Sequence, residues 1–494
     1  MKQIYMGRDK TPSFTIACIA VACLFLLGAG FAQQLPVGCP TALSRLDLLH
    51  SLLHKRLNID AQHTNTPDKA QYKGHFYSDK APGTVVLALP AFAAAVISLR
   101  VAGVPLDSDA GWLVSSWVAC LGSIGIIAAL GAGLMVAWLS QWVGLRHSIV
   151  TTLGLFLGAA PLPYSTMMFS HALVVGLLCI AICAVARQAS AQFEHRGGGT
   201  GHWLKARRWV LLAGFASGWA LASEYTAGVV LGGLLVSLAS QGWRRAVPFC
   251  LAAVPPLLLI PLYSWACFGS PFILPYSLNA SFPEMKEGLY AIKWPDPETA
   301  FHLLFGPARG LLFWTPFLAI AIVGYRRLAA SNLPLFCLTY AVPLLQIIVI
   351  SGRTWDWPAG PTLGPRYLAP ILPLLALPCA LGVQRFPRLG IALAGYSILI
   401  TTLATLTNAS PPFPGHPNPL FDLHIPMLLK GQLAPNLGTV CGLPPWLSVV
   451  VYYAILCGGI WWLWHRLPPE SAEGTPPADP PLSVGVNAKS TCSC

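Results

Sequence analysis

Charged residues are scarce in this chain. Lys, Arg, Asp and Glu together make up 10% of its 494 residues, and only 18 residues are acidic. Hydrophobic residues make up 55%, and the mean hydropathy is +0.61. A soluble domain of ordinary composition carries about 25% charged residues, so a soluble fold is excluded. The composition instead predicts an all-α polytopic membrane protein.

The sequence also lacks the patterns of a disulfide-stabilised or metal-binding protein. Its 14 cysteines fall mostly inside apolar windows, as small hydrophobic residues: Cys120, Cys179, Cys183, Cys250, Cys337 and Cys379. Cys39 and Cys441 are expected to face outward, and a bridge between them is a hypothesis. No metal-ligand spacing occurs. We therefore predict no cofactor, and a divalent cation that assists the chemistry stays an open alternative.

Apolar windows recur along nearly the whole chain. Windows of roughly 17 to 25 residues are long enough to cross a bilayer as helices. About twelve are expected, at residues 13–32, 111–138, 148–166, 170–187, 208–223, 225–241, 246–267, 310–325, 332–351, 367–384, 388–407 and 446–465. The first window follows basic residues and ends in Gly30-Phe31-Ala32, so it is either an anchor or a cleaved signal peptide.

The distribution of Lys and Arg predicts which side each loop faces. Short cytoplasmic loops are enriched in these residues. An inside start places the basic positions on that side: Arg146, Arg187 to Arg208, Arg244, Arg245, Arg326, Arg327, Arg385, Arg388 and the tail after Arg466. The net charge of +12 is then explained by contact with anionic lipid. No segment has the basic and aromatic pattern of a nucleic-acid binder, so we expect membrane lipids and no nucleic acid as partners.

This orientation holds only if the apolar segment Thr84 to Leu99 does not cross the membrane. Counting it as a span would move the basic loop at 196–208 to the outside. We therefore expect it to lie at the outer interface. The predicted organisation is an N-terminal anchor at 1–32, a first extracytoplasmic loop with interfacial helices at 33–110, a multi-span domain at 111–467 and a disordered cytoplasmic tail at 468–494. The predicted location is the inner (plasma) membrane.

The first outward loop is the most informative segment. Leu46, Leu49, Leu53 and Leu57 have the spacing of an amphipathic helix that would lie flat on the membrane. A run of polar residues follows, made up of Asp60, His63, Asp68, Lys69, His75, Asp79 and Lys80, and it ends just before apolar sequence. Polar side chains gathered at a membrane edge indicate a candidate active site.

Three segments carry a resemblance to a known superfamily. Tyr77-Ser78-Asp79-Lys80-Ala81-Pro82 is similar to the Y-x-E-K-P-P pattern in the first periplasmic loop of GT-C membrane glycosyltransferases, in the branch of protein mannosyltransferases and lipid A aminoarabinose transferases. Segments 305–316 and 364–370 resemble stretches in bacterial members of that superfamily. The resemblance spans most of residues 14–407, and it rests on the order of the segments.

The resemblance implies transfer of a sugar from a polyprenyl-phosphate donor to a lipid, glycan or protein acceptor outside the cytoplasm. Its aminoarabinose branch carries an acid, as the expected base, at a position that corresponds to Thr41–Ser44, where this chain has no carboxylate. Asp60, then Asp47 and Asp79, are the candidate catalytic bases. We expect an inverting displacement through an oxocarbenium-like transition state.

The leaving phosphate needs cations. Lys80 could hold a phosphate oxygen as a point charge, and Arg366 and Arg353 could clamp it with planar pairs of hydrogen bonds. The alternative is that Arg366 caps a loop or reaches lipid headgroups, and that Asp79 is only the ion-pair partner of Lys80.

A second group of residues is predicted to bind substrate: His75, His171, Glu224, Tyr367 and Trp355. Each also has a structural interpretation. A histidine at a membrane edge often caps a helix or packs, Glu224 could cap the following helix, and Trp355 could belong to the aromatic belt. A transporter or lipid flippase without transferase activity is the alternative function, since it too would have about twelve spans. A non-catalytic assembly subunit is a third.

Overall fold

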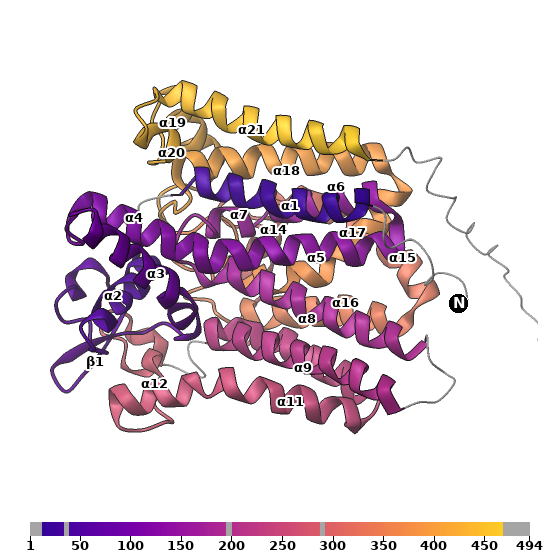
Figure 1. The fold of residues 1–494 in the computed structure, drawn as a ribbon, viewed down its shortest axis with the longest axis horizontal. Helices are drawn as coiled ribbons and strands as arrows, with labels where there is room; N and C mark the ends of the chain where they lie inside the picture. The colour runs from indigo at the N-terminus through magenta and orange to yellow at the C-terminus, as the bar shows by residue number, and fades with distance from the viewer. Residues whose placement is uncertain (1–11, 34–38, 194–199, 287–291, 468–494) are drawn as a thin grey trace, which may run out of the picture.

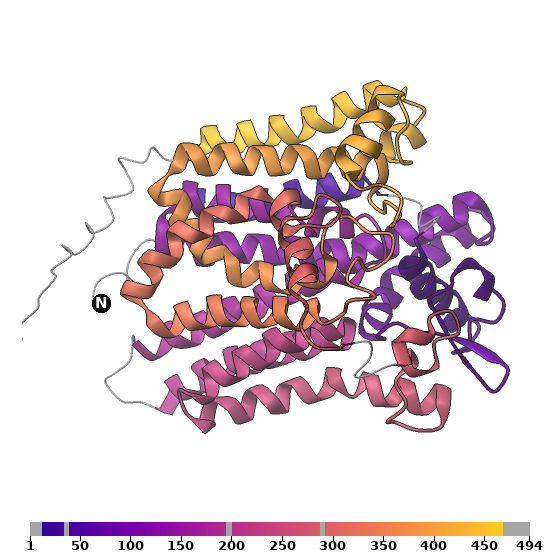
Figure 2. The same cartoon turned by 180° about the vertical axis from the view of Figure 1, so that it is seen from behind.

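The computed structural model describes residues 12–33, 39–193, 200–286 and 292–467. Within these residues the chain is helical, apart from connecting loops and one two-stranded sheet. The predicted tail at 468–494 lies outside the described residues. Most long helices run side by side along the longest axis of the molecule (Figures 1 and 2).

The helices of the first half are α1 (Pro12–Phe31), α2 (Pro40–Leu53), α3 (Gly83–Val101), α4 (Asp109–Cys120), α5 (Ile126–Val143), α6 (Leu145–Phe156), α7 (Pro161–Tyr164), α8 (Ser170–Phe193), α9 (Thr200–Ser223) and α10 (Gly228–Ala239). Those of the second half are α11 (Trp243–Leu257), α12 (Leu259–Phe268), α13 (Pro297–Phe305), α14 (Leu311–Trp314), α15 (Ala321–Ser331), α16 (Leu333–Ser351), α17 (Leu372–Arg385), α18 (Pro387–Asn408), α19 (Ile425–Leu429), α20 (Leu437–Val440) and α21 (Pro445–Arg466).

Short elements complete the chain. The strands are β1 (Lys69–Tyr72) and β2 (His75–Ser78). The 3-10 turns are η1 (His63–Asn65), η3 (Tyr225–Ala227), η4 (Pro275–Leu278), η5 (Pro283–Lys286), η6 (Pro316–Ile320) and η7 (Arg366–Ile371), and η2 (Leu121–Gly125) and η8 (Leu420–His424) are π-helical turns.

In the described part of the chain, nine helices are long and apolar enough to cross a membrane. This finding confirms the all-α multi-pass class, but it does not confirm the expected count of twelve. Windows 148–166 and 310–325 are divided into α6 with α7 and into α14, η6 and α15. Prolines at 161 and 316 lie at these divisions, where a residue without a backbone N–H interrupts a helix.

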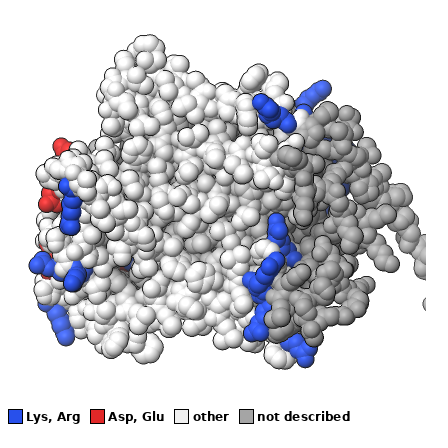
Figure 3. Space-filling model, in the orientation of Figure 1, with Lys and Arg blue, Asp and Glu red and all other residues white. Residues whose placement is uncertain are grey.

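Charged side chains mark the two ends of the bundle. We call the end with α2, β1, α3 and α4 the loop end, and the end where α1 begins and α21 finishes the tail end (Figure 1). On the face in Figure 3, the described acidic side chains lie at the loop end, Lys and Arg lie at both ends, and a broad uncharged band separates them. The band is the surface expected to face lipid.

The helices at the centre of the bundle begin beside the polar loops. The apolar segment Arg366–Arg385, formed by η7 and α17, is 94% buried, whereas the segment that forms α21 is 22% buried. Helix α8 is also largely enclosed. Arg366 and Ser170, the first residues of η7 and α8, therefore lie where the core meets the loop end.

A β-hairpin in the first loop determines which polar residues meet. Strands β1 and β2 pair antiparallel, with Lys69 opposite Ser78 and Tyr72 opposite His75. The two turn residues, Lys73 and Gly74, both have positive φ, which is the tight turn that suits a two-residue hairpin. Because Lys69 pairs with Ser78, the next residues outward, Asp68 and Asp79, emerge side by side.

Helix α3 lies at the loop end, although its length and composition would also suit a membrane span. Its first residue, Gly83, lies so close to Ala222 and Ser223 at the end of α9 that an added Cβ would be 2.7 Å from their atoms. Its middle, at Ala91, packs against Gly122 in the turn between α4 and α5. Helix α3 thus packs against the end of α9 and against the middle of the continuous helix Asp109–Val143, and its place at the interface stays a prediction.

The hypothesis of a Cys39–Cys441 bridge is wrong. Both residues are free cysteines; Cys39 is buried and Cys441 is exposed. Cys39 lies at the start of α2, inside the main apolar core, whereas Cys441 follows α20 on the surface.

Arg309, in the segment that resembles GT-C proteins, is a structural cation. It is fully buried, and its guanidinium donates to the backbone carbonyls of Ala308, Pro358, Gly360 and Pro411. Its charge also lies over the ring of Phe413. One side chain therefore satisfies carbonyls from three loops at the same end of the bundle.

Replacing Arg309 should destabilise the protein. We expect R309M to lower the free energy of unfolding by about 3 kcal/mol, because it leaves several buried carbonyls without donors. Thermal unfolding of the detergent-purified protein measures this loss. R388M is the control, since Arg388 is exposed at the start of α18. Equal midpoints for R309M and R388M would contradict the structural role of Arg309.

Candidate functional site

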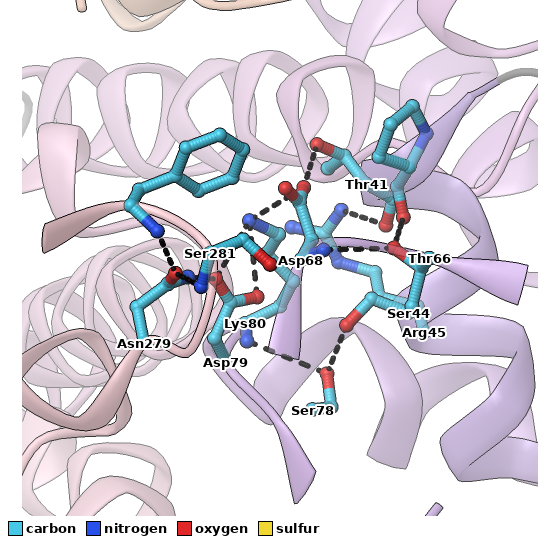
Figure 4. Close-up of polar contacts among 12 residues, drawn as sticks. Thr41, Ser44, Arg45, Thr66, Asp68, Ser78, Asp79, Lys80, Asn279 and Ser281 are labelled. Carbon is cyan, nitrogen blue, oxygen red and sulfur yellow. Dashed lines mark hydrogen bonds and ion pairs between the residues drawn. The ribbon is translucent and has the colours of Figure 1, made fainter. Parts of the chain in front are cut away.

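Lys80 lies between two carboxylates at the loop end. Its Nζ is 2.8 Å from Asp68 Oδ2 and 3.1 Å from Asp79 Oδ1 (Figure 4). All three side chains are buried. The hairpin register brings the two aspartates together, and Lys80 supplies the charge that keeps them there.

Two further side chains hold the carboxylates. Thr41 Oγ1 donates to Asp68 Oδ2 at 2.8 Å, and Asn279 Nδ2 donates to Asp79 Oδ2 at 2.8 Å. Burial disfavours the charged form of Lys80, but Asp68 and Asp79 outweigh it and raise the pKa of Lys80. Burial also disfavours the charged form of the two carboxylates. It raises the pKa of Asp79, whereas at Asp68 the effect of Lys80 outweighs burial and lowers the pKa. The ammonium charge of Lys80 is therefore already compensated within the protein.

Arg366 is different, because its hydrogen bonds go to hydroxyl groups. Its Nη1 donates to Thr41 Oγ1 at 3.2 Å and its Nη2 donates to Tyr367 Oη at 3.4 Å. Its Nε is buried without a hydrogen-bond partner in the described residues. The guanidinium also lies over the rings of Phe169 and Tyr367. No carboxylate of the described chain forms an ion pair with it, so its donors are available to an anion.

A second arginine adjoins Arg366 through Tyr367. Tyr367 Oη donates to Asp356 Oδ2 at 2.7 Å, and Arg353 forms an ion pair with the same carboxylate. The Arg353 guanidinium lies 4.9 Å from the centre of the Tyr367 ring. Burial disfavours its charge, but Tyr367 and Asp356 outweigh burial and raise the pKa of Arg353. Loop 352–365 thus adds one acid and one cation.

A fourth cation, Arg45 on α2, connects the group to α8 and α9. It donates to Thr41 O at 3.2 Å and to Ser170 Oγ at 3.0 Å. Ser170 Oγ in turn donates to Glu224 Oε2 at 2.8 Å. The imidazole of His171 lies 3.7 Å from the same carboxylate oxygen.

These contacts join eight charged side chains at the loop end into one network, which we call the charge cluster: Lys80, Arg45, Arg353, Arg366, Asp68, Asp79, Asp356 and Glu224. Thr41 connects the Lys80 part to Arg366 and Arg45, and Tyr367 connects Arg366 to Asp356. Four positive and four negative groups balance. In the described residues, no group of three or more His, Cys, Asp or Glu side chains could hold a metal ion.

Most of the predicted site residues lie in or against the charge cluster: Asp79, Lys80, Arg366, Arg353, His171, Glu224 and Tyr367. Asp60 and His75 lie apart. They pair with each other at 2.6 Å on the exposed hairpin, and Asp60 also accepts a bond from the Phe76 backbone. Trp355 packs against Phe282 and is partly exposed.

Asp47 also lies apart from the charge cluster. It is buried on α2, where Asn65 Nδ2 donates to its Oδ1 at 3.0 Å and its Oδ2 has no hydrogen-bond partner. Burial raises the pKa of Asp47 to about 7.

Sequence reasoning missed Asp68, Arg45 and Thr41. A usable signal existed for Asp68, since a Lys-Gly turn between two short alternating strands fixes the hairpin register and places Asp68 opposite Asp79. Arg45 gave no signal, because an arginine next to an amphipathic helix is normally solvated.

The fold is similar to that of ArnT from Cupriavidus metallidurans. Its crystal structure bound to undecaprenyl phosphate aligns with a TM-score of 0.52 and 14% identity, over 92% of this chain and 77% of that chain. This chain has the ArnT fold. The apo structure of ArnT aligns with a TM-score of 0.48 and 15% identity, over 91% and 75%. No protein-family model and no curated protein matches the chain. At 14% identity, this likeness shows the fold alone.

Asp47 predicts a pH dependence of stability. Its pKa is raised on folding, from 3.8 to about 7, so the folded state holds a proton that the unfolded state releases. This contribution is complete below about pH 4 and is lost as the pH rises through 7. We expect D47N to raise the free energy of unfolding at pH 8 by about 1 to 3 kcal/mol, and this gain to shrink steadily as the pH falls toward 4.

Thermal melts of D47N and the wild type between pH 4.5 and 8 measure this difference. D60N is the matched control, because Asp60 is exposed on the same loop. A D47N curve parallel to that of the wild type across this range would contradict the raised pKa.

Proposed function

We propose that this chain is a membrane glycosyltransferase that takes a sugar from a polyprenyl-phosphate donor and gives it to a lipid, glycan or protein acceptor outside the cytoplasm. The observation that carries the proposal is Arg366. Its guanidinium is buried at the loop end, bonds to the hydroxyls of Thr41 and Tyr367, and has no carboxylate partner in the described residues.

The phosphate of the donor would be the direct ion-pair partner that Arg366 lacks in the described residues. A guanidinium matches phosphate oxygens with two parallel hydrogen bonds. Because burial raises the pKa of Asp79, proton uptake at Asp79 can offset the added negative charge. Arg366 and Arg353 would bind the phosphate, and Lys80 would stay held by Asp68 and Asp79.

The comparison with ArnT supports a polyprenyl-linked partner. One of the two ArnT structures holds undecaprenyl phosphate, and 92% of this chain aligns with it. The charge cluster lies where α8, η7 and the first loop meet, at the loop end, and the uncharged band of the surface separates that end from the tail end (Figure 3). A lipid phosphate at this depth would keep its chain in the bilayer and its headgroup among the cations.

The transfer reaction requires two kinds of group from the protein, namely cations and a base. The bond between the sugar carbon and the phosphate oxygen breaks, and cations stabilise the charge on the leaving phosphate. The acceptor hydroxyl attacks the same carbon from the other side, and a carboxylate receives its proton. The charge cluster has both kinds of group within one buried network.

A transporter would be built differently. It would place charged residues near mid-membrane, beside broken helices. In the described chain, the buried ion pairs of the charge cluster lie at the loop end. This placement favours surface chemistry over passage through the bundle.

Changing Arg366 to lysine tests the phosphate site. We expect R366K to weaken binding of undecaprenyl phosphate about 10-fold, because lysine lacks the planar pair of donors. R100K is the control, since Arg100 is exposed at the end of α3. Native mass spectrometry of the purified protein measures binding, and radiolabelled polyprenyl-phosphate sugars measure transfer. Unchanged lipid binding by R366K would refute the site.

The loop end should face away from the cytoplasm. Among the described cysteines, Cys441 is exposed on a loop at this end, whereas the other exposed ones, Cys23, Cys250, Cys337 and Cys457, lie on long apolar helices. An impermeant maleimide added to spheroplasts should therefore label the wild type, and C441S should lose that labelling. Labelling of Cys441 only after lysis would reverse the orientation and exclude the proposed function.

A further inference from the structure

The four carboxylates of the charge cluster are not paired alike. Asp68 and Asp79 each lie within 3.1 Å of Lys80 Nζ, and Asp356 contacts Arg353 and Tyr367. Glu224 differs, because its nearest arginine nitrogen, on Arg45, is 4.0 Å away. Glu224 is the one carboxylate of the cluster without a close pairing to a lysine or arginine.

The contacts of Glu224 involve one oxygen. Oε2 accepts from Ser170 Oγ and lies near Arg45 and His171. The contacts of Glu224 with described residues leave Oε1 without a hydrogen-bond partner, and the residue retains 8% of its exposure. The second oxygen can therefore accept a proton from a bound group, while Oε2 holds the carboxylate in place.

His171 supplies an independent sign of a ligand. Its side chain is 1% exposed, and neither ring nitrogen has a hydrogen-bond partner in the described residues. A buried polar group without a partner costs about 1 to 3 kcal/mol. Its Nε2 lies 3.7 Å from Glu224 Oε2, so a polar group bound beside Glu224 would also complete the bonding of His171.

Glu224 also lies close to the proposed phosphate site. It follows Ser223, which packs against Gly83, three residues after Lys80. The ring of Tyr276 lies 5.6 Å from Lys80 Nζ and 5.7 Å from the ring of Tyr225, the neighbour of Glu224. The end of α9 and the Lys80 loop thus border one site.

We infer that Glu224 is the general base that accepts the proton of the acceptor hydroxyl, with His171 beside it to orient the acceptor. This role rests on the proposed function. The acceptor O–H bond breaks and its proton goes to Glu224. The acceptor oxygen forms a bond to the sugar carbon, and the bond from that carbon to the donor phosphate breaks, with its electron pair leaving on the phosphate. The acids of the first loop, Asp60 and Asp47, have no part in this step.

The electrostatics favour a carboxylate form that can act as a base. Burial would raise the pKa of Glu224, but His171, Arg45 and Arg366 outweigh burial and hold its pKa below the ordinary value. The charged and titratable groups that face Glu224 come from α2 (Arg45), α8 (His171), η4 (Tyr276) and η7 (Arg366). Glu224 is therefore ionised at neutral pH, which is the form that a general base needs.

The first test compares E224Q with E298Q in the purified full-length protein. Glutamine keeps the size of Glu224 and an oxygen for Ser170, but it takes no proton at neutral pH. We expect E224Q to lower the turnover of polyprenyl-phosphate sugars by about 100-fold or more. Glu298 is exposed on α13, so E298Q should keep wild-type turnover. The readout is release of polyprenyl phosphate from a panel of radiolabelled donors, with a membrane lipid extract as acceptor.

Two further measurements separate a base from a structural residue. Binding of undecaprenyl phosphate to E224Q should stay within about 2-fold of the wild type, because Glu224 does not hold the phosphate. Turnover of the wild type should fall as the pH drops and Glu224 takes a proton, and the residual activity of E224Q should lack that slope. E224D should regain part of the lost turnover.

The outcomes separate the inference from the proposed function. Transfer by the wild type with E224Q within 3-fold of it overturns the base assignment and leaves the transferase standing. Loss of lipid binding by E224Q, with no change of pH slope, also overturns the assignment, since Glu224 would then be structural. Absence of transfer by the wild type from every donor overturns the proposed function and the base assignment with it.

Discussion

The burial of charge at the loop end is the constraint on which the rest of this structure depends. Moving an ion out of water costs several kcal/mol even after the protein relaxes, so a buried cation needs an acid or a set of oxygen acceptors. The charge cluster meets this demand with equal numbers of positive and negative groups. Its members come from the first loop, α2, loop 352–365, η7 and the end of α9, so these segments must fold together.

Irregular backbone beside a bilayer poses a related problem. Carbonyls outside a helix need donors, and a lipid environment has none to offer. Arg309 donates to carbonyls of three loops from one fully buried side chain, and Arg45 does the same on a smaller scale for the carbonyl of Met168, just before α8. Arginine suits this task because its five donors are arranged in a rigid plane.

The sequence predicted what depends on hydrophobicity and failed where long-range contacts decide. Apolar windows and basic loops predicted a multi-pass helical protein, and the Asp79-Lys80 motif located part of the charge cluster. Asp60 is the first candidate base in the sequence and Asp68 is not a candidate, because a sequence does not show that Asp60 is partly exposed beside His75 and that Asp68 is buried against Lys80. The pairing of Thr41 with Arg366 joins residues 325 positions apart, and no local pattern encodes it.

Gly83 sets how closely two parts of the charge cluster can approach. Its backbone touches Ala222 and Ser223 at a separation that leaves no room for a side-chain carbon, and Trp219 donates to its carbonyl. This contact holds the loop that carries Lys80 close to the end of α9, which Glu224 follows. The absence of a side chain at Gly83 therefore sets the distance between the segment that carries Lys80 and the segment that carries Glu224. Any larger residue at position 83 would push the two segments apart.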